Sequence, residues 1–587
     1  MKRFFIFFAA LAILLTACAA PTADIPAATV TAPAPTATPV QSVPVQVWLT
    51  TADQSKLLEP QPDLAFELQP VEAAKIIQVN ENNPYQQMDG FGASMTDSSA
   101  WLIYTQLSET QRANVMSALF SPTEGIGVSI TRIPMGASDF VHGDPYTYDD
   151  MPAGQTDPEL ANFSIEHDQA YIIPALQDAL KLNPDLKIMA SPWSAPAWMK
   201  SSDALGNGKL LPEYYSVYAN YFVKFIQAYQ AENIPVYAIT LQNEPHFEPH
   251  SYPGMRMEPQ EAAEFVKNHL GPAFEAAGLD TKIIIWDHNW DEPDYPIAVL
   301  DDPQAKAYIA GSAFHCYGGT VIAQGLVHEA HPDRDIYFTE CSSGAWIPDF
   351  GAQLKRDVKE LVTGSTRNWA KTVIMWNLAL DTSYGPHNGG CSNCYGFVAI
   401  DPALESGFTF NADYFSFGHA SKFVAPGAYR IASSSFTYEG LESVAFLNPD
   451  GSKVLIASNT GSKEKAFALR WGDRFLAYTL PGESVATFTW EGTQQNSKIP
   501  AKPTDLKVRS NPAGQLIVTW EFSALAESYN VKRSTESGGP YTVLETGIQT
   551  PEYVDTQAEA GSSYFYVVSA VNALGEGSDS AETSLAP

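Results

Sequence analysis

The chain has 587 residues, with 34 Lys and Arg against 66 Asp and Glu, which gives a formal net charge of -32. This excess of acidic residues argues against nucleic acid as a partner, because phosphate backbones are bound by clustered Lys and Arg. With 45% hydrophobic and 12% aromatic residues, the chain can form large cores, which excludes an acidic disordered polymer. Charged residues are only 17% of the chain, so neutral polar side chains must cover much of the surface, as suits a neutral ligand such as a sugar.

Residues 1–18 are typical of an exported protein. Lys2 and Arg3 form a basic start, and the apolar stretch from Phe4 to Leu15 is too short to span a bilayer comfortably. The stretch ends in Leu15-Thr16-Ala17-Cys18, which resembles the bacterial lipoprotein box and implies cleavage before Cys18 and lipid attachment to its sulfur. An ordinary signal peptide with a chance cysteine is the alternative. We therefore expect a lipoprotein anchored in a membrane at Cys18, on the cell surface or facing the periplasm.

A tether and a group of strands follow the signal peptide. Residues 19–44 are rich in Pro, Thr and Ala with almost no charge, a composition that favours an extended chain. Short strands are expected within residues 45–80. They have no partner in a barrel that begins after them, so we expect them to join a sheet formed later in the chain.

Residues 81–407 contain eight short apolar runs, most of them followed by a segment long enough for a helix. Such an alternation predicts a (β/α)8 barrel, whose chemistry lies at the carboxyl ends of the strands. The segment 215–231 carries aromatic side chains at helical spacing and is expected in the outer ring. The runs end near residues 92, 134, 193, 244, 287, 317, 340 and 377.

Two β-rich segments complete the chain. Residues 408–490 read as short alternating strands and predict a side β-sandwich that the strands of residues 45–80 join. Residues 491–502 form a polar linker. In the tail, residues 503–587, Val518-Thr519-Trp520 precedes Tyr564 and Tyr566 on a later strand. This pattern resembles a fibronectin type III domain, in which such aromatic residues belong to the core.

Besides Cys18, the chain has four cysteines, at positions 316, 341, 391 and 394. Cys391 and Cys394 form a single C-x-x-C motif without a second pair at zinc spacing, so a structural zinc site is not expected. In an oxidising compartment these two residues are expected either to clip a small loop or to pack as two thiols.

Two carboxylates are the strongest candidates for catalysis. Glu244 ends the fourth apolar run and Glu340 ends the seventh, where a Glu without a partner or a task is rare. In an eight-stranded barrel about 15 Å across, strands three apart bring two such side chains to about 6 Å. That distance is nearer the ~5 to 5.5 Å of retaining glycosidases than the ~6.5 to 9.5 Å of inverting ones. Two Glu side chains that merely bridge the barrel top are the structural alternative.

Residues 46–490 resemble glycoside hydrolase family 30, which contains glucosylceramidases and endo-β-1,6-glucanases. The resemblance implies that Glu244 is the acid/base and Glu340 the nucleophile, and that the anomeric configuration is retained. It also implies a barrel with a side β-sandwich built from both flanks. The motifs that carry it are Asp89-Gly90-Phe91-Gly92-Ala93-Ser94-Met95-Thr96-Asp97, Arg132-Ile133-Pro134-Met135, Ser191-Pro192-Trp193-Ser194-Ala195-Pro196, Asn243-Glu244-Pro245, Phe338-Thr339-Glu340, Trp376-Asn377-Leu378 and His419-Ala420-Ser421-Lys422-Phe423.

The same motif matching implies a set of sugar-binding residues. Asn243 is expected to hydrogen-bond the 2-hydroxyl, and Arg132 is expected to keep the nucleophile ionised. Asp139 is expected to bind outer hydroxyls, and the hydroxyl of Tyr317 to hydrogen-bond Glu340. The remaining two, which offer apolar faces to the sugar ring, are Trp193 and Trp376. For each of these residues, packing at the barrel top is the structural alternative.

The substrate expected from the resemblance is a β-1,6-linked glucan. Residues 387–396, 252–255 and 286–290 look more like the β-1,6-glucanase branch than like the lysosomal glucosylceramidase, although Asn388 and Cys341 depart from that branch. A glucosylceramide-like β-glucoside is the alternative substrate, and a non-catalytic carbohydrate-binding surface lipoprotein is the alternative class. No cofactor and no metal are expected for this chemistry.

Overall fold

The computed structural model describes residues 42–511, 514–559 and 561–585. The predicted signal peptide, the predicted lipid attachment at Cys18 and nearly all of the predicted tether lie outside these residues. In the described part of the chain, no helix is both long and apolar enough to cross a membrane.

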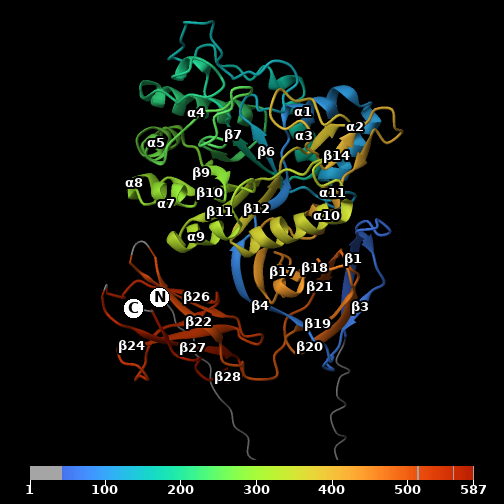
Figure 1. The fold of residues 1–587 in the computed structure, drawn as a ribbon, viewed down its shortest axis with the longest axis vertical. Helices are drawn as coiled ribbons and strands as arrows, with labels where there is room; N and C mark the ends of the chain where they lie inside the picture. Colours follow the sequence, from blue (N-terminus) through green and yellow to red (C-terminus); the bar gives the residue numbers. More distant parts are fainter. Residues whose placement is uncertain (1–41, 512–513, 560, 586–587) are drawn as a thin grey trace, which may run out of the picture. The chain divides into compact units, whose positions relative to one another are not determined.

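A closed barrel of eight parallel strands forms the centre of the largest part of the chain (Figure 1). Its strands are short and buried on both faces, which explains why they read as continuous apolar runs rather than as alternating patterns. Each run that the sequence predicts as a barrel strand contributes one strand, and the predicted (β/α)8 barrel is confirmed. The strands are β5 (Gly90–Ala93), β6 (Ile130–Pro134), β7 (Lys187–Ser191), β8 (Val236–Thr240), β9 (Lys282–Asn289), β10 (Ile309–His315), β11 (Asp335–Glu340) and β12 (Ala370–Met375).

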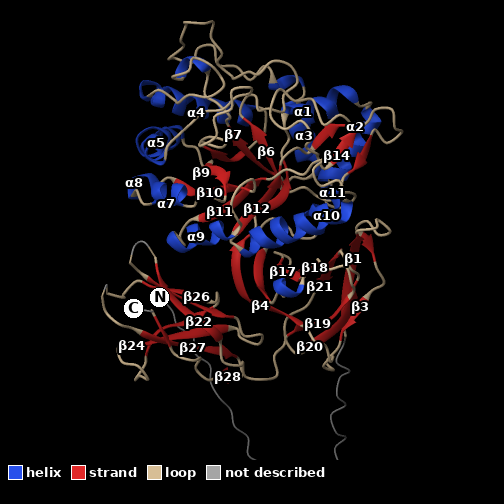
Figure 2. Cartoon of the chain, viewed as in Figure 1, coloured by secondary structure: helices blue, strands red, loops and turns tan. Residues whose placement is uncertain are grey.

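Helices surround these strands, as the blue ribbons of Figure 2 show. The predicted segment 215–231 forms α4 (Tyr215–Ala231), which buries Tyr218, Phe222 and Phe225 against the barrel. The other α-helices are α1 (Asp97–Trp101), α2 (Glu109–Phe120), α3 (Ile172–Leu182), α5 (Pro259–Phe265), α6 (Gly271–Ala277), α7 (Asp294–Leu300), α8 (Pro303–Lys306), α9 (Ile322–Ala330), α10 (Phe350–Arg356) and α11 (Ala412–Ser421). Wider π-helical turns extend three of them, at η1 (Leu102–Gln106), η5 (Val266–Leu270) and η6 (Asp357–Ser365).

Strands from both flanks of the barrel share one ten-stranded sheet. β1 pairs antiparallel with β21, and β4 lies between β16 and β19. β4 extends to Gln87, beyond the predicted boundary between residues 80 and 81. The first barrel strand therefore begins at Gly90, later than that boundary. The strands are β1 (Val43–Thr51), β2 (Glu59–Pro60), β3 (Leu64–Phe66), β4 (Ile76–Gln87), β16 (Tyr429–Ser433), β17 (Leu441–Leu447), β18 (Lys453–Asn459), β19 (Lys465–Trp471), β20 (Arg474–Leu480) and β21 (Ser484–Trp490).

The segment between the barrel and this sheet differs from the predicted run of short strands. It contains a small sheet of β13 (Ala379–Asp381), β14 (Val398–Ile400) and β15 (Phe408–Phe410), and then α11. All ten residues of α11 are buried. A helix that is buried on every side has no polar face, and so lacks the periodicity by which a surface helix is recognised in a sequence.

The C-terminal module is a sandwich of two sheets, as the resemblance to a fibronectin type III domain implies. β22 (Thr504–Ser510), β23 (Leu516–Glu521) and β26 (Glu552–Asp555) form one sheet. The other contains β24 (Ser528–Ser534), β25 (Thr542–Ile548), β27 (Phe565–Asn572), β28 (Gly575–Glu576) and β29 (Thr583–Ser584). Trp520, Tyr564 and Tyr566 lie in its core.

Candidate active site

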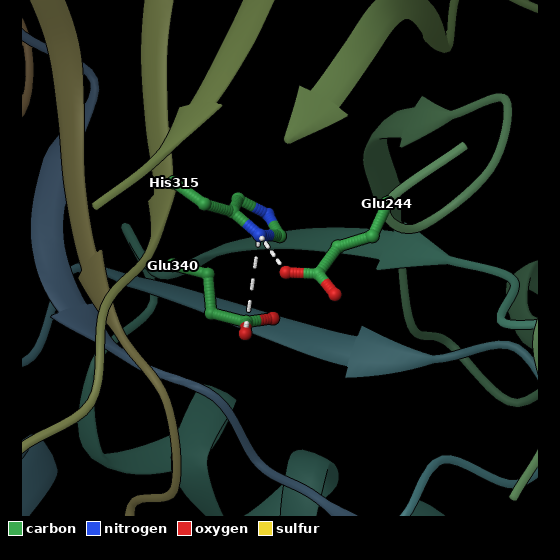
Figure 3. A group of neighbouring side chains, drawn as sticks. All are labelled: Glu244, His315 and Glu340. Carbon is green, nitrogen blue, oxygen red and sulfur yellow. Dashed lines mark hydrogen bonds and ion pairs between the residues drawn. The ribbon is translucent and has the colours of Figure 1, made fainter. Parts of the chain in front are cut away.

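Glu244 and Glu340 face each other at the carboxyl ends of β8 and β11. His315, the last residue of β10, lies between them, and its Nδ1 is directed toward both carboxylates (Figure 3). The closest polar atoms of the three side chains all lie within 4.8 Å of one another. One carboxylate oxygen of Glu244 and one of Glu340 therefore lie within 4.8 Å of each other, which is compatible with the short spacing of a retaining pair.

Arg132 connects the nucleophile candidate to the rest of the site. It is the middle residue of β6 and is fully buried. Its Nη1 donates to Glu340 Oε2 at 2.5 Å, and its Nη2 donates to Asn243 Oδ1 at 2.7 Å. The guanidinium thus supplies positive charge directly to one carboxylate of the pair, which favours the ionised form of that carboxylate.

Asp287, near the end of β9, carries a negative charge that balances the positive charge of Arg132. Its Oδ2 accepts from Arg132 Nη2 at 2.7 Å, and its Oδ1 accepts from Thr339 Oγ1 at 2.7 Å. Burial acts to raise the pKa of Asp287, but the charges of Arg132 and His315 outweigh it and hold the pKa well below its ordinary value. Asp287 is therefore a fixed negative charge that orients the arginine.

The backbone at two of these positions has a left-handed conformation. Glu244 has φ 47° and Asp287 has φ 64°. The amide of Glu244 donates to the backbone oxygen of Asp287 at 3.0 Å, which joins the two strained positions. Such conformations are uncommon for residues other than glycine and concentrate at functional sites.

His315 makes two hydrogen bonds through its ring nitrogens. Its Nδ1 lies 3.1 Å from Glu244 Oε1, and its Nε2 lies 3.1 Å from Asp287 Oδ1. Burial alone lowers the pKa of His315, but the charge of Glu340 and the bonds to Asp287 and Glu244 raise the pKa to about 9. At neutral pH the contact between His315 and Glu244 therefore holds one proton.

The two catalytic candidates have different partners. Burial raises the pKa of Glu340, against the opposing charges of His315 and Arg132. Burial also acts to raise the pKa of Glu244, but the hydrogen bond and charge of His315 outweigh it and lower the pKa. Glu244 is therefore the carboxyl group that can exchange a proton with His315. Glu340 instead contacts the permanent positive charge of Arg132.

Tyr317 and Asp139 complete the polar side of the site. The hydroxyl of Tyr317 donates to Glu340 Oε1 at 2.9 Å, which is the contact that the sequence predicts. Asp139 is almost completely buried. Burial, with the charge of Glu340 as the next cause, raises the pKa of Asp139 to about 8, so this carboxyl is largely neutral at pH 7.

A cavity of about 650 Å³, a volume within the range of small-molecule sites, is lined by Glu244, Glu340, Asn243, Asp139 and Tyr317 among others. Trp193 and Trp376 stack on one another with ring centroids 5.1 Å apart, and the guanidinium of Arg132 lies 4.8 Å from the Trp193 ring. Trp346 lines the outer part of the cavity and is 47% exposed. The six predicted sugar-binding residues come together here or border this cavity: Arg132, Asp139, Trp193, Asn243, Tyr317 and Trp376.

All four described cysteines form disulfides. Cys391 pairs with Cys394, which is the loop clip of the two predicted alternatives, and both residues line the cavity. Cys316 pairs with Cys341, a bond that the sequence reading does not predict. It joins the residues that directly follow His315 and Glu340.

The spacing of Glu244, His315 and Glu340 also matches a set of metal ligands. The donors are, however, already engaged in other bonds. Arg132 binds one oxygen of Glu340, and His315 Nε2 faces Asp287. Positive charge next to the carboxylate opposes a second cation, so the arrangement favours proton transfer rather than metal binding.

Asp287 and His315 are functional candidates without a predicted role. Each lies at or near the carboxyl end of a barrel strand, as Glu244 and Glu340 do. The criterion that selects the two Glu residues, a titratable side chain at the carboxyl end of a barrel strand, therefore also finds these two.

Comparison with known proteins agrees with this geometry. Residues 88–424 match the model of the glycosyl hydrolase family 30 TIM-barrel domain, and residues 427–488 match that of the glycosyl hydrolase family 30 beta sandwich domain. The chain belongs to glycosyl hydrolase family 30. The resemblance inferred from the sequence motifs is thereby confirmed, and this family 30 chain is a β-glycoside hydrolase.

Its family 30 relatives include two kinds of enzyme. The chain is 37% identical over 431 residues to an endo-1,6-beta-D-glucanase of Aspergillus fumigatus, covering 69% of this chain and 85% of the relative. It is 30% identical over 443 residues to the lysosomal acid glucosylceramidase of Mus musculus, covering 71% and 83%. The solved structure of the endo-beta1,6-glucanase BT3312 matches with a TM-score of 0.71 at 37% identity, covering 76% of this chain and 99% of that chain.

Proposed function

We propose that the chain hydrolyses β-1,6-linked glucan by double displacement, with Glu340 as nucleophile and Glu244 as acid/base. The observation that carries the mechanism is the pair of carboxyl groups within 4.8 Å of one another, with Arg132 bound to only one of them. The substrate is inferred from the relatives, since the glucanases reach 37% identity and the glucosylceramidase 30%.

In the first step, a carboxylate oxygen of Glu340 attacks the anomeric carbon and the bond to the leaving oxygen breaks. Glu244 gives a proton to that oxygen, and the contact with His315 supplies the proton to Glu244. The product is a glycosyl ester on Glu340 and a free leaving group.

In the second step, water attacks the same carbon from the opposite side to Glu340. Glu244 takes the proton of the water, and the ester bond breaks to restore the Glu340 carboxylate. Two inversions give net retention, so NMR of the fresh product should show the β-anomer before it mutarotates.

Neighbouring residues would position the sugar. The amide oxygen of Asn243 is occupied by Arg132, which leaves its NH2 group to donate to the 2-hydroxyl. Trp193 and Trp376 would pack against the sugar ring, and Asp139 would bind outer hydroxyls.

A substrate panel tests the proposal. Purified protein is assayed with β-1,6-glucan, β-1,3-glucan, xylan and a glucosylceramide at equal glycosidic-bond concentrations. We expect clear preference for β-1,6-glucan. Cleavage of the lipid alone would replace the glucanase assignment with the glucosylceramidase alternative and leave the roles of Glu244 and Glu340 standing. Binding without any turnover would favour the non-catalytic lipoprotein.

Asp139→Asn should change the alkaline side of the pH profile. The carboxyl of Asp139 is neutral below its pKa of about 8 and gains a negative charge beside Glu340 above it. In the wild type, kcat/KM should therefore begin to fall near pH 8. Asn cannot ionise, so the decline in the variant should move to about pH 9, where the proton on His315 is lost.

The measurement is kcat/KM from pH 5 to 10 on one soluble substrate. Asp144→Asn, on an exposed residue of the same loop, serves as the control and should keep the wild-type profile. An unchanged alkaline limb in Asp139→Asn would contradict the assignment of that limb to Asp139.

We further propose that the enzyme is exported and anchored to a membrane through Cys18. The lipoprotein-like motif at residues 15–18 supports this, and two disulfides in the described chain are typical of an oxidising compartment. Metabolic labelling with a radioactive or clickable fatty acid, compared with a Cys18→Ser variant, tests the anchor.

A further inference from the structure

A disulfide lies directly behind the two strand ends that carry His315 and Glu340. These two residues are register partners of the parallel strands β10 and β11. Cys316 and Cys341 are the next residues along the chain, and their Cα atoms lie 5.3 Å apart. Because successive side chains point to opposite faces, the cysteines face away from the cavity while their neighbours face into it.

The same two strands also approach closely at their other end, at Gly311 of β10. A Cβ atom at Gly311 would lie 2.0 Å from the backbone oxygen of Asp335, so only glycine fits there. The covalent link therefore closes a pair of strands that backbone contact already holds together at its other end.

Tyr317 is the next residue of the chain after Cys316. Its hydroxyl contacts Glu340 Oε1 and Ser342 Oγ, each at 2.9 Å, yet the residue is 47% exposed. Two glycines follow it, and Gly319 has φ 79°. The amide of Tyr317 donates to Asn289 Oδ1 at 3.0 Å, and a Cβ atom at Gly319 would lie 2.4 Å from the backbone nitrogen of Asp291, so the segment after Tyr317 packs closely on the neighbouring loop. Cys316 holds the N-terminal side of Tyr317, so the disulfide and these contacts together set the position of the ring.

Arg356 holds the disulfide from behind. This last residue of α10 donates through Nη2 to Cys341 Sγ at 2.7 Å and lies 3.4 Å from Cys316 Sγ. Its Nη1 donates to the backbone oxygen of Ser342 at 3.0 Å. One side chain thus contacts both sulfurs and the residue whose hydroxyl meets Tyr317.

We propose that the Cys316–Cys341 disulfide is a positioning clamp that keeps the hydroxyl of Tyr317 on the nucleophile Glu340. This inference rests on the proposed function, because it takes Glu340 as the nucleophile. A hydrogen bond to the charged carboxylate favours ionisation, so loss of the clamp raises the pKa of Glu340. Turnover then falls, and the acidic limb of the pH profile moves to higher pH.

A double-mutant cycle in the full chain tests the clamp. The proteins compared are the wild type, Cys316→Ala/Cys341→Ala, Tyr317→Phe and the triple variant. Tyr317→Phe should lower kcat/KM by about 10- to 100-fold, as expected for loss of a hydrogen bond to a charged group. The double cysteine variant should lose less kcat/KM than Tyr317→Phe, and the acidic limb of its pH profile should also move to higher pH. The triple variant should have a kcat/KM no lower than that of Tyr317→Phe.

One control separates positioning from general stability. Ile226→Val, in the buried face of α4 and remote from the site, lowers stability and should leave the pH profile unchanged. The clamp proposal is wrong if the separate losses of kcat/KM multiply in the triple variant. It is also wrong if the acidic limb of the pH profile keeps its position when the disulfide is removed.

Should the wild type cleave no β-glycoside, the proposed function fails and crystal structures decide the clamp separately. Displacement of Tyr317 from Glu340 in the double cysteine variant would support it. An unchanged 2.9 Å contact in that variant would overturn it.

Discussion

Glu340→Gln should lower kcat by roughly 10⁴-fold or more, the scale of loss seen when a covalent nucleophile is removed. The amide has nearly the shape of the carboxylate but is a far weaker nucleophile. It also loses the ion pair with Arg132, while Asp287 still balances the guanidinium, so the fold should persist. The measurement is turnover of β-1,6-glucan and of an aryl β-glucoside, with circular dichroism as the check on folding.

Glu442→Gln is the matched control for this variant. Glu442 lies in β17, is 3% exposed and contacts Thr437 and Ser435 rather than the cavity. Its activity should equal that of the wild type. If Glu340→Gln turned over substrate at a comparable rate, the double-displacement mechanism would be wrong.

Glu244→Ala should lower kcat on glucan by about 10²- to 10⁴-fold, the usual contribution of a general acid/base. The loss should be much smaller with an aryl β-glucoside that has a good leaving group, because departure of that group needs no proton. The second step would still be slow, since no base activates water. Azide needs no base, so it should restore turnover in this variant and leave a β-glycosyl azide.

Product analysis by NMR and mass spectrometry decides this prediction. Azide should neither accelerate the wild type nor rescue Glu340→Gln, because the ester intermediate cannot form on glutamine. Absence of the β-glycosyl azide from Glu244→Ala, or an α-linked product, would count against the acid/base role of Glu244.

Much of the site follows from one property of the sequence. In a barrel of parallel strands, the carboxyl ends meet at one face, so a polar residue that ends an apolar run is placed there by topology alone. The motif resemblance adds Arg132, whereas this argument alone brings Glu244 and Glu340 together. It applies equally to Asp287 and His315, whose roles need the observed hydrogen bonds to be recognised.

Other features depend on tertiary contacts that no local pattern encodes. Cys316 and Cys341 are 25 residues apart, and their pairing requires the register of β10 and β11. The left-handed backbone at Glu244 accompanies a hydrogen bond to Asp287 on the neighbouring strand, a contact between residues 43 apart. Likewise, α11 is buried on all sides, so its sequence lacks the polar stripe of a surface helix.

The ten-stranded sheet has a consequence for synthesis of the chain. β1 leaves the ribosome early, but its partner β21 is encoded about 440 residues later. At 5–20 residues per second, β1 waits roughly 20 to 90 s with an unpaired edge. Premature termination anywhere before residue 484 would leave that edge open permanently, and exposed strand edges promote aggregation. The edge of β1 is therefore protected only after the chain has been extended through β21.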